Sequence, residues 1–473
     1  MAIERADELD PGAELSAAEP SEASSVQRVG LGTLLTFAGA NLVPTGATLG
    51  LTLYLPRYYS AHQAIGLAAV GTAFTVVRLI DIAVDPALGF WMDHTRTRIG
   101  RYRPWLLAGI PVLMLSLYML FMPPAQAGWF YLTGWLLVFY LGTSLLMLSQ
   151  SAWAAALSPS YAERARIFAY ITIAGSLGSV TFLLSPLVLG GRQASDAHLM
   201  QVMGWVMVGV LPVLGGLAAL RTPEPARAAP HSSHRVRLAD YWRLARRASV
   251  VRLVLADLAL AIGSGGATPI FIFFWHDARG YSLTQASIML VAYAAGGLLG
   301  APFWGRVGGR IGKHLGLQIG VAAWVVGYLT AANLPPGNFP LILVLQVWNG
   351  FCLAIMLLIR AMVADVADEV RLEQGRDRGA LLYSLISSTQ KVGGALAVSI
   401  TFFLLALMGF NPAAHDAAKH TRGVVLVFMS DPTIFVVLGA LVLWGYPLNA
   451  ARHRAIIAEL DAKAREAAPD ARS

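Results

Sequence analysis

The chain has 473 residues, of which 56% are hydrophobic and only 13% charged, and its mean hydropathy is +0.60. Because soluble domains carry about 25% charged residues, this composition excludes an ordinary water-soluble domain and predicts a membrane protein. The net charge of +8 is spread between apolar runs instead of being gathered on one polar module, so we expect no nucleic-acid partner.

Residues 1–28 form an acidic, polar stretch ahead of the first apolar run. They contain seven acidic residues and two arginines. A secretory signal peptide begins with basic residues followed by an apolar stretch, and this segment has neither. We expect a disordered cytoplasmic tail, with the first membrane span serving as the targeting signal.

Twelve apolar segments follow, each long enough to cross a bilayer core of about 30 Å as a helix. They cover roughly 30–55, 63–92, 104–123, 128–157, 166–190, 198–220, 250–275, 282–305, 314–334, 339–364, 379–409 and 423–448. Several connections are short and contain Pro or Gly, which makes neighbouring spans antiparallel. The sequence therefore predicts an all-α membrane protein with twelve transmembrane helices.

Lys and Arg are distributed unevenly between the two sets of connections. The connections after spans 2, 4, 6, 8 and 10 carry nineteen of them, against five in the other set. Basic loops stay on the cytoplasmic side of a membrane. Both termini should therefore be cytoplasmic, in a multi-pass protein of the cytoplasmic (inner) membrane.

An internal repeat relates the two parts of the chain. The motif RIGR at 98–101 reappears as RIGK at 310–313, and Arg164 and Arg166 reappear at the same offset as Arg376 and Arg378. Two matches at one offset, each in an equivalent loop, indicate two pseudo-symmetric six-helix halves. The resulting plan has an N-terminal half over 29–220, a cytoplasmic linker over 221–249, a C-terminal half over 250–448 and a cytoplasmic tail over 449–473. The end of the linker, 238–250, is either an amphipathic helix on the inner leaflet or a solvated segment.

Three charged residues lie in the second span. Arg78, Asp81 and Asp85 share one helical face by their spacing, and each charge near the bilayer centre costs about 2.5–3.5 kcal/mol. Two carboxylates one turn apart repel unless a cation or a proton lies between them. Pro86 also leaves the carbonyl of Ile82 without its helical donor. These oxygens predict a site for Na⁺ or H⁺. The alternative is a structural Arg–Asp pair, which leaves the second acid unexplained.

Span 11 contains a basic residue, Lys391, in the run STQKVGG (388–394). It lies about 18 Å into its segment at 1.5 Å per residue, which is too deep to reach water easily. The two following glycines permit close approach of another helix. We expect Lys391 to face the N-terminal half and to balance one of the span-2 acids, with a purely structural ion pair as the alternative. At the repeat offset those acids correspond to Tyr293 and Gly297, so the acidic site belongs to the N-terminal half alone.

Further polar and aromatic residues lie within the spans. Asn41, Gln150, Asp257, Gln346, Asn349 and Arg360 could line a cavity, although each alone is more often an interhelical hydrogen-bonding residue. Trp153, Trp348 and Tyr383 could stack on a sugar ring, but packing is the commoner role. From these segments we assign Trp153, Asn349, Tyr383 and Gln390 to a substrate cavity.

Charged residues in the cytoplasmic loops are candidates for a gate between the two halves. They are Asp93, Arg98, Arg101, Arg164, Arg166, Arg310, Asp365, Asp368, Arg376 and Arg378.

Two runs carry a family resemblance. RLIDIAVDPALGFWMDHTRTRIGRYRPW (78–105) and ADVADEVRLEQGRDRGALLYSLISSTQKVGG (364–394) resemble the signature of the glycoside–pentoside–hexuronide:cation symporters, the melibiose permease group of the major facilitator superfamily. The resemblance covers nearly the whole chain after the tail. It implies a major facilitator fold, a small-molecule substrate, and a coupling Na⁺, Li⁺ or H⁺ bound by Asp81 and Asp85, with Lys391 essential nearby.

The resemblance also implies a difference at the sugar site. Sugar-binding members have one acid in span 1 and another in span 4 that hold sugar hydroxyls. Alignment on YLPRYY (54–59) and on Trp153 places neutral Thr45 and Ser149 at these positions. Because carboxylates accept paired hydroxyl donors more strongly than neutral side chains do, the coupling part of the site is retained while the sugar-binding part is changed.

We therefore expect a secondary active transporter that couples Na⁺ or H⁺ to the symport of a sugar, glycoside or similar small organic solute by alternating access. It should lie in the lipid bilayer as a monomer and need no cofactor besides the coupling ion. The alternative is a cation-coupled carrier of a non-sugar amphiphile such as a lysophospholipid. A non-transporting membrane enzyme or sensor is a remote alternative, because the histidines are scattered mostly in loops and no nucleotide-binding loop or metal-ligand spacing appears.

Overall fold

The computed structural model describes residues 29–63, 65–158, 161–189, 195–224, 247–374, 379–410 and 417–467. The predicted tail 1–28, most of the linker with its amphipathic segment, and the loop residues Arg376 and Arg378 lie outside these ranges. The side chain of Asp93 also lies outside the described part.

The N-terminal half consists of seven helices that make six spans. They are α1 (Leu31–Gly39), α2 (Leu42–His62), α3 (Leu67–His94), α4 (Arg103–Phe121), α5 (Trp129–Ala156), α6 (Tyr161–Leu189) and α7 (Asp196–Arg221). The helices α1 and α2 together form the first span, and the chain turns between them at Ala40 and Asn41. The amide Nδ2 of Asn41 donates to the carbonyl of Ile171 at 3.1 Å, so this break is tied to α6.

The C-terminal half has the same number of spans. Its helices are α9 (Ala248–Ile272), continued by the π-helix η1 (Phe273–Ala278), then α10 (Leu283–Ile311), α11 (Lys313–Asn333), α12 (Phe339–Leu353), α13 (Met356–Gln374), α14 (Gly379–Leu407) and α15 (Ala417–Val442). The tenth span is divided into α12 and α13. After α15, helix α16 (Ala450–Ala467) occupies most of the segment 449–473, which the sequence predicts as the C-terminal tail.

Twelve stretches of the described chain are long and apolar enough to cross a membrane, and no β-strand occurs in the described ranges. The predicted all-α fold with twelve transmembrane helices is confirmed. Several of these helices contain an interior proline, including Pro56 in α2, Pro86 in α3 and Pro269 in α9. Membrane helices tolerate such prolines because neighbouring helices can satisfy the freed carbonyl groups.

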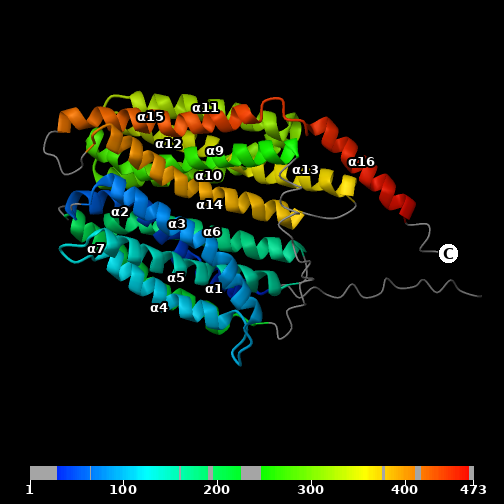
Figure 1. Cartoon of the computed structure of the whole chain (residues 1–473), viewed down its shortest axis with the longest axis horizontal. Coiled ribbons are helices and arrows are strands. Elements are labelled where there is room, and N and C mark those ends of the chain that lie inside the picture. The colour runs from blue at the N-terminus through cyan, green and yellow to red at the C-terminus, as the bar shows by residue number, and fades with distance from the viewer. Residues whose placement is uncertain are drawn as a thin grey trace, which may run out of the picture.

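The two halves form two layers of helices (Figure 1). Helices α1 to α7 lie in one layer and α9 to α15 in the other, and α3 and α14 make the most extensive contact between them. Helix α16 projects from one end of the bundle, which we call the α16 end. Helices α3, α5, α7, α10 and α13 end at the α16 end, whereas α2, α4, α6, η1, α11 and α14 end at the opposite end.

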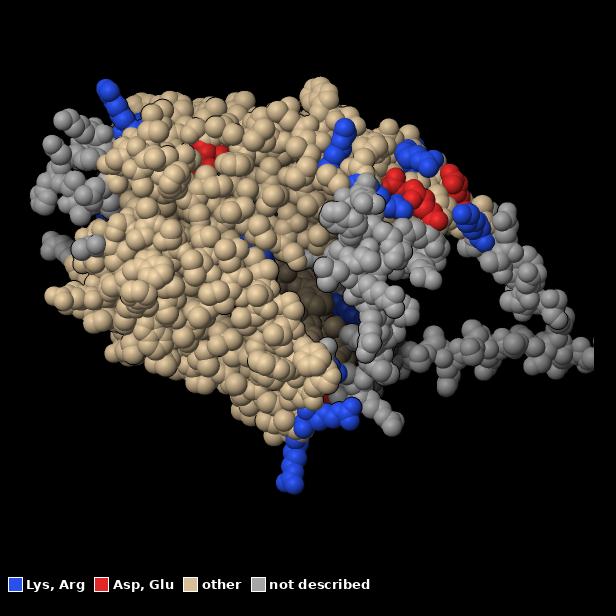
Figure 2. All heavy atoms as spheres, viewed as in Figure 1, with Lys and Arg blue, Asp and Glu red and all other residues tan. Residues whose placement is uncertain are grey.

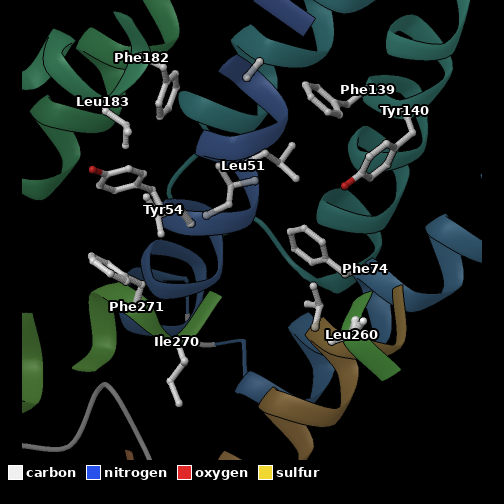
Figure 3. Packing of buried hydrophobic residues seen from close by; sticks show 14 of the residues in the cluster. Leu51, Tyr54, Phe74, Phe139, Tyr140, Phe182, Leu183, Leu260, Ile270 and Phe271 are labelled. Carbon is white, nitrogen blue, oxygen red and sulfur yellow. The ribbon is translucent and has the colours of Figure 1, made fainter. Parts of the chain in front are cut away.

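A continuous apolar core joins the halves. Figure 3 shows Leu51 and Tyr54 of α2 between Phe182 of α6 on one side and Ile270 and Phe271 of α9 on the other. All five side chains are buried. In lipid, where burial from water provides little drive between helices, such association depends on close packing and hydrogen bonding. The α2–α9 contact is therefore held by the fit of these side chains.

Close packing is most evident between α10 and α12, where glycines bring the two backbones together. A Cβ atom at Gly296 would overlap the carbonyl of Val347, and one at Gly350 would overlap the carbonyl of Tyr293. Backbone atoms cannot move aside as a flexible side chain can. Small residues at these positions are therefore required for the observed helix spacing.

We predict that Gly296→Ala lowers the melting temperature of the purified protein by several degrees, because α10 and α12 must separate to admit the methyl group. The matched control is Gly305→Ala on the same helix, where a Cβ atom meets nothing within 4 Å. Alanine is favoured over glycine in a helix by about 1 kcal/mol, so the control should match or slightly exceed the wild type. Equal melting temperatures for the two variants, measured by thermal shift in detergent, would contradict the packing argument.

Candidate functional site

Helix α3 places Arg78, Asp81 and Asp85 along one face, as their spacing predicts. Asp81 is only 5% exposed. Its Oδ1 accepts a hydrogen bond from the Ser144 hydroxyl of α5 at 3.1 Å, and its Oδ2 lies 3.5 Å from the guanidinium of Arg78. That guanidinium also lies over the ring of Tyr140, 4.0 Å from its centroid. Helix α5 thus holds both members of the Arg78–Asp81 pair.

One turn further along α3, Asp85 forms an ion pair with Lys391 of α14 through Oδ2. The other oxygen, Oδ1, is buried and accepts no hydrogen bond from the described residues. Pro86 follows directly within the helix, so the carbonyl of Ile82 has no helical N–H donor. The Asp85 Oδ1 atom therefore lacks the donor that buried oxygens usually have, and the carbonyl of Ile82 lacks its helical one.

The Asp85–Lys391 pair belongs to a tightly packed interface between the two halves. The hydroxyls of Thr75 and Ser399 form a hydrogen bond across the same interface. Further along, a Cβ atom at Gly71 would lie 3.1 Å from the Cβ of Phe402. Because these contacts join α3 to α14, a change in the position of Lys391 directly affects how the two halves pack against each other.

The oxygen atoms around Asp81 and Asp85 suit a hard monovalent cation or a proton. Carboxylate, hydroxyl and carbonyl oxygens are the ligands that such cations take, and the described residues contain no group of three or more His, Cys, Asp and Glu side chains arranged to hold a metal ion. In the arrangement observed, Arg78 faces Asp81 and Lys391 faces Asp85. The two carboxylates are therefore balanced by side chains, and an added cation would compete with one of them.

At the opposite end, the two halves are joined by polar contacts. The guanidinium of Arg57 on α2 binds the carboxylate of Asp277 on η1, with N–O distances of 3.0–3.2 Å. The hydroxyls of Tyr54 and Ser287 lie 2.8 Å apart nearby. No sequence motif relates Arg57 to Asp277, because the two residues are 220 positions apart in the chain. These contacts close the opposite end.

At the α16 end, the described ion pairs stay within one half. Lys313 pairs with Asp365 at 2.5 Å, and the imidazole of His453 on α16 lies 3.3 Å from Asp365 and 3.1 Å from Asp368. In the N-terminal half, Arg166 pairs with Glu163 at 2.9 Å. None of these described pairs crosses between the halves, in contrast to Arg57–Asp277.

Two charged residues at the ends of the linker also bind within their own halves. The carboxylate of Glu224 accepts hydrogen bonds from the backbone N–H groups of Arg101, Tyr102 and Arg103. Arg247 pairs with Glu373 of α13 at 2.7 Å. The role of Glu224 could not be predicted from the sequence, since a lone acidic residue after a span belongs to no motif. Three other loop arginines were predicted as gate residues. Arg164 donates to the carbonyl of Ser158 in its own half, and the side chains of Arg98 and Arg310 are exposed.

A cavity of about 530 Å³ lies among α9, α13 and α14. Its lining includes Asp257, Ser264, Arg360 and Gln390. Figure 2 shows a recess between the two halves at the α16 end, with basic atoms visible inside it. Of the residues assigned to a substrate cavity from the sequence, Gln390 lines this one. Asp257 and Arg360 also line it, although the sequence alone favoured an ordinary interhelical role for each.

The other predicted cavity residues take different places in this conformation. Ser149 and Trp153 are fully buried: the Ser149 hydroxyl donates to carbonyls of its own helix, and the Trp153 indole donates to the carbonyl of Pro223. Asn349 is 1% exposed. Thr45 has a buried hydroxyl without a described partner, and the hydroxyl of Tyr383 donates to the carbonyl of Arg360 at 3.2 Å. None of these five is among the residues that line the cavity, although Tyr383 bonds to the backbone of the lining residue Arg360.

We predict that Lys391→Ala destabilises the protein, because it leaves Asp85 without its partner at low dielectric. Breaking a buried ion pair costs about 3–5 kcal/mol, and the partial exposure of Lys391 should reduce the loss to the lower part of that range or below it. The double variant Lys391→Ala/Asp85→Asn removes both charges and should recover much of the melting temperature in a thermal-shift series. A double variant no more stable than Lys391→Ala would show that the pair is not the source of the loss.

The closed opposite end generates a second prediction. Arg57→Ala should increase labelling of a cysteine placed at buried Ser287 by a membrane-impermeant maleimide several-fold, because the Arg57–Asp277 contact no longer holds the halves together. The chain has one native cysteine, Cys352, which is buried and is replaced by Ala in the background. Arg422→Ala, at an exposed arginine of the same end, serves as the matched control. If the cysteine is labelled at the same rate in both variants, the Arg57–Asp277 contact does not close this end.

Comparisons with known proteins agree with this architecture. The chain is 26% identical over 429 residues to the glucuronide carrier protein homolog of Escherichia coli, covering 86% of this chain and 91% of the relative. It is 24% identical over 433 residues to the isoprimeverose transporter of Lactiplantibacillus pentosus, covering 87% and 88% of the two chains. It is 23% identical over 465 residues to the sphingosine-1-phosphate transporter MFSD2B of Mus musculus, covering 92% of each.

Among solved structures, the chain resembles a crystal structure of the nucleoside transporter NupG with a TM-score of 0.64 and 13% identity, covering 87% of this chain and 98% of that one. At this identity the likeness shows the fold alone. Residues 37–450 match the family described as MFS/sugar transport protein, a span that includes all twelve candidate membrane helices except the first residues of α1. This multi-pass membrane protein therefore belongs to the MFS/sugar transport protein family, within the major facilitator superfamily.

Proposed function

We propose that this transporter couples the downhill entry of Na⁺ or H⁺ to the symport of a small organic solute by alternating access. The observation that carries the proposal is the Asp85–Lys391 ion pair between α3 and α14, beside a buried carboxylate oxygen without a described donor. This arrangement links a cation-binding carboxylate directly to the contact between the two halves.

In the proposed cycle, the coupling ion competes with Lys391 for Asp85. A metal ion bound by Asp81 and Asp85, or a proton on Asp85, neutralises the negative charge that holds the ammonium group of Lys391 against α3. The Asp85–Lys391 contact between α3 and α14 is then released, and the equilibrium between conformations shifts. A ligand changes such an equilibrium only through its different affinities for the two states, and competition with Lys391 supplies that difference.

The conformation of the structure corresponds to one of the two states of this cycle. The opposite end is closed by Arg57–Asp277, whereas the cavity lined by Asp257, Arg360 and Gln390 lies toward the α16 end. The excess of basic residues in the connections at the α16 end favours a cytoplasmic location for it. We therefore assign the structure to an inward-facing state in which both termini are cytoplasmic.

For the solute, a sugar or glycoside is the first candidate, in line with the printed names of the glucuronide and isoprimeverose relatives. A lysophospholipid-like amphiphile is the second. It is favoured by the neutral residues Thr45 and Ser149 at the positions of the sugar-holding acids, and by the relative that is a sphingosine-1-phosphate transporter.

The deciding experiment is uptake into proteoliposomes under an imposed Na⁺ gradient, an imposed H⁺ gradient, or neither, with glycosides, hexuronides and a lysophospholipid as solutes. Asp81→Asn and Asp85→Asn should each reduce gradient-driven accumulation by about tenfold or more, since an ion-binding carboxylate contributes at least 1.4 kcal/mol. Exchange of solute without a gradient should persist, because it needs no coupling ion.

Glu459→Gln, which neutralises an acid far from α3 on α16, should accumulate solute like the wild type. Full gradient-driven accumulation in both span-2 variants would refute cation coupling at these acids.

A further inference from the structure

A polar cluster in the C-terminal half takes no part in the coupling mechanism described above. Asp257 of α9, Arg360 of α13 and Gln390 of α14 come from three different helices and line one cavity. The Gln390 amide connects the other two: its Nε2 donates to Asp257 Oδ1 at 3.3 Å, and its Oε1 accepts from the Arg360 guanidinium at 3.5 Å. The three side chains therefore act as one unit.

Arg360 is the cationic member of this cluster and has spare hydrogen-bonding capacity. Its side chain is exposed to the cavity, and among the described residues it forms no ion pair and only the long bond to the neutral Gln390 amide. A guanidinium carries five N–H donors in a planar fork that matches carboxylate and phosphate groups. Within a membrane segment, an ionisable group of this kind usually marks a substrate or ion pathway.

Asp257 is the buried member of the cluster. It is 2% exposed, and its Oδ2 has no hydrogen-bond partner in the described chain although the residue lines the cavity. Buried carboxylate oxygens are normally hydrogen-bonded, because burial without a donor is costly. Solute hydroxyl groups are suitable donors for this oxygen.

We infer that Asp257, Arg360 and Gln390 form a substrate subsite in which Arg360 binds a carboxylate or phosphate group of the solute and Asp257 accepts its hydroxyl groups. The preferred solute is thus a hydroxylated anion. This inference rests on the proposed transport function, and it concerns a residue set on the half of the protein that does not hold the coupling acids. Arg360 is the specificity-determining residue, and Gln390 positions it.

The test is equilibrium binding to the purified protein with two matched pairs of probes and no ion gradient. One pair is 4-nitrophenyl β-D-glucuronide and 4-nitrophenyl β-D-glucoside, which differ in a carboxylate. The other is lysophosphatidate and the monoacylglycerol of the same chain length, which differ in a phosphate. The wild type should prefer the anionic member of one pair by about tenfold or more, the range of a charge-assisted hydrogen bond. The pair that shows the preference identifies a sugar acid or an acidic amphiphile.

Arg360→Gln should bring that preference close to one, and Arg360→Lys should retain part of it because the charge remains without the fork. Arg306→Gln is the matched control: this arginine of α10 donates to the carbonyl of Pro302 and lies outside the cavity lining, so the preference should be unchanged. Gln390→Glu provides a second route if Arg360→Gln folds poorly, since a carboxylate beside Arg360 should occupy it and abolish the preference with the arginine still present.

The inference is overturned if the wild type prefers the anion in neither pair, or if the preference survives in folded Arg360→Gln or Gln390→Glu protein. Because binding is measured without a gradient, a failure of Asp81 and Asp85 to couple transport would leave this preference intact. The two proposals therefore fail separately.

Discussion

The ion pair between Asp85 and Lys391 is the interaction on which the proposed coupling depends. Neither charge is stable alone at this depth of a membrane, since each needs a partner or water. Asp85 lies on α3 and Lys391 on α14, so the charge that each half carries at this interface is neutralised by a residue of the other half. Further along the same two helices, Gly71 packs closely against Phe402, so α3 and α14 are also held together by an apolar contact. A cation at Asp85 therefore changes a contact between halves as well as a local charge.

The two ends of the molecule differ in what crosses between the halves. At the opposite end, Arg57 and Asp277 connect them, whereas the described ion pairs at the α16 end connect elements within one half. Each half is thus held together internally by ion pairs of its own. Alternation requires only that a few contacts between the halves be exchanged, because the contacts within each half are kept.

The features that depend on local periodicity could be predicted from the sequence. Apolar length predicted the twelve spans, and helical spacing predicted that Arg78, Asp81 and Asp85 share one face. The lining of the cavity could not be predicted in the same way, because it depends on how each helix is rotated about its own axis by tertiary packing. Ser149 and Trp153 are in spans of the expected type but turn into the protein interior, while Asp257 and Arg360 face the cavity. Pairs distant in the chain, such as Arg57–Asp277, leave no periodic signal. The roles assigned to the site residues remain predictions.

Glu224 and Arg247 have a mechanical consequence for the covalent connection between the halves. Glu224 fastens the chain to the loop before α4, and Arg247 fastens it to Glu373 of α13, so the connection is anchored at both ends. Each of these two contacts joins parts of a single half, so neither would have to break if the two halves moved relative to each other. A movement between the halves would therefore be opposed by the contacts that cross between them, such as Arg57–Asp277 and Asp85–Lys391, and not by these two anchors.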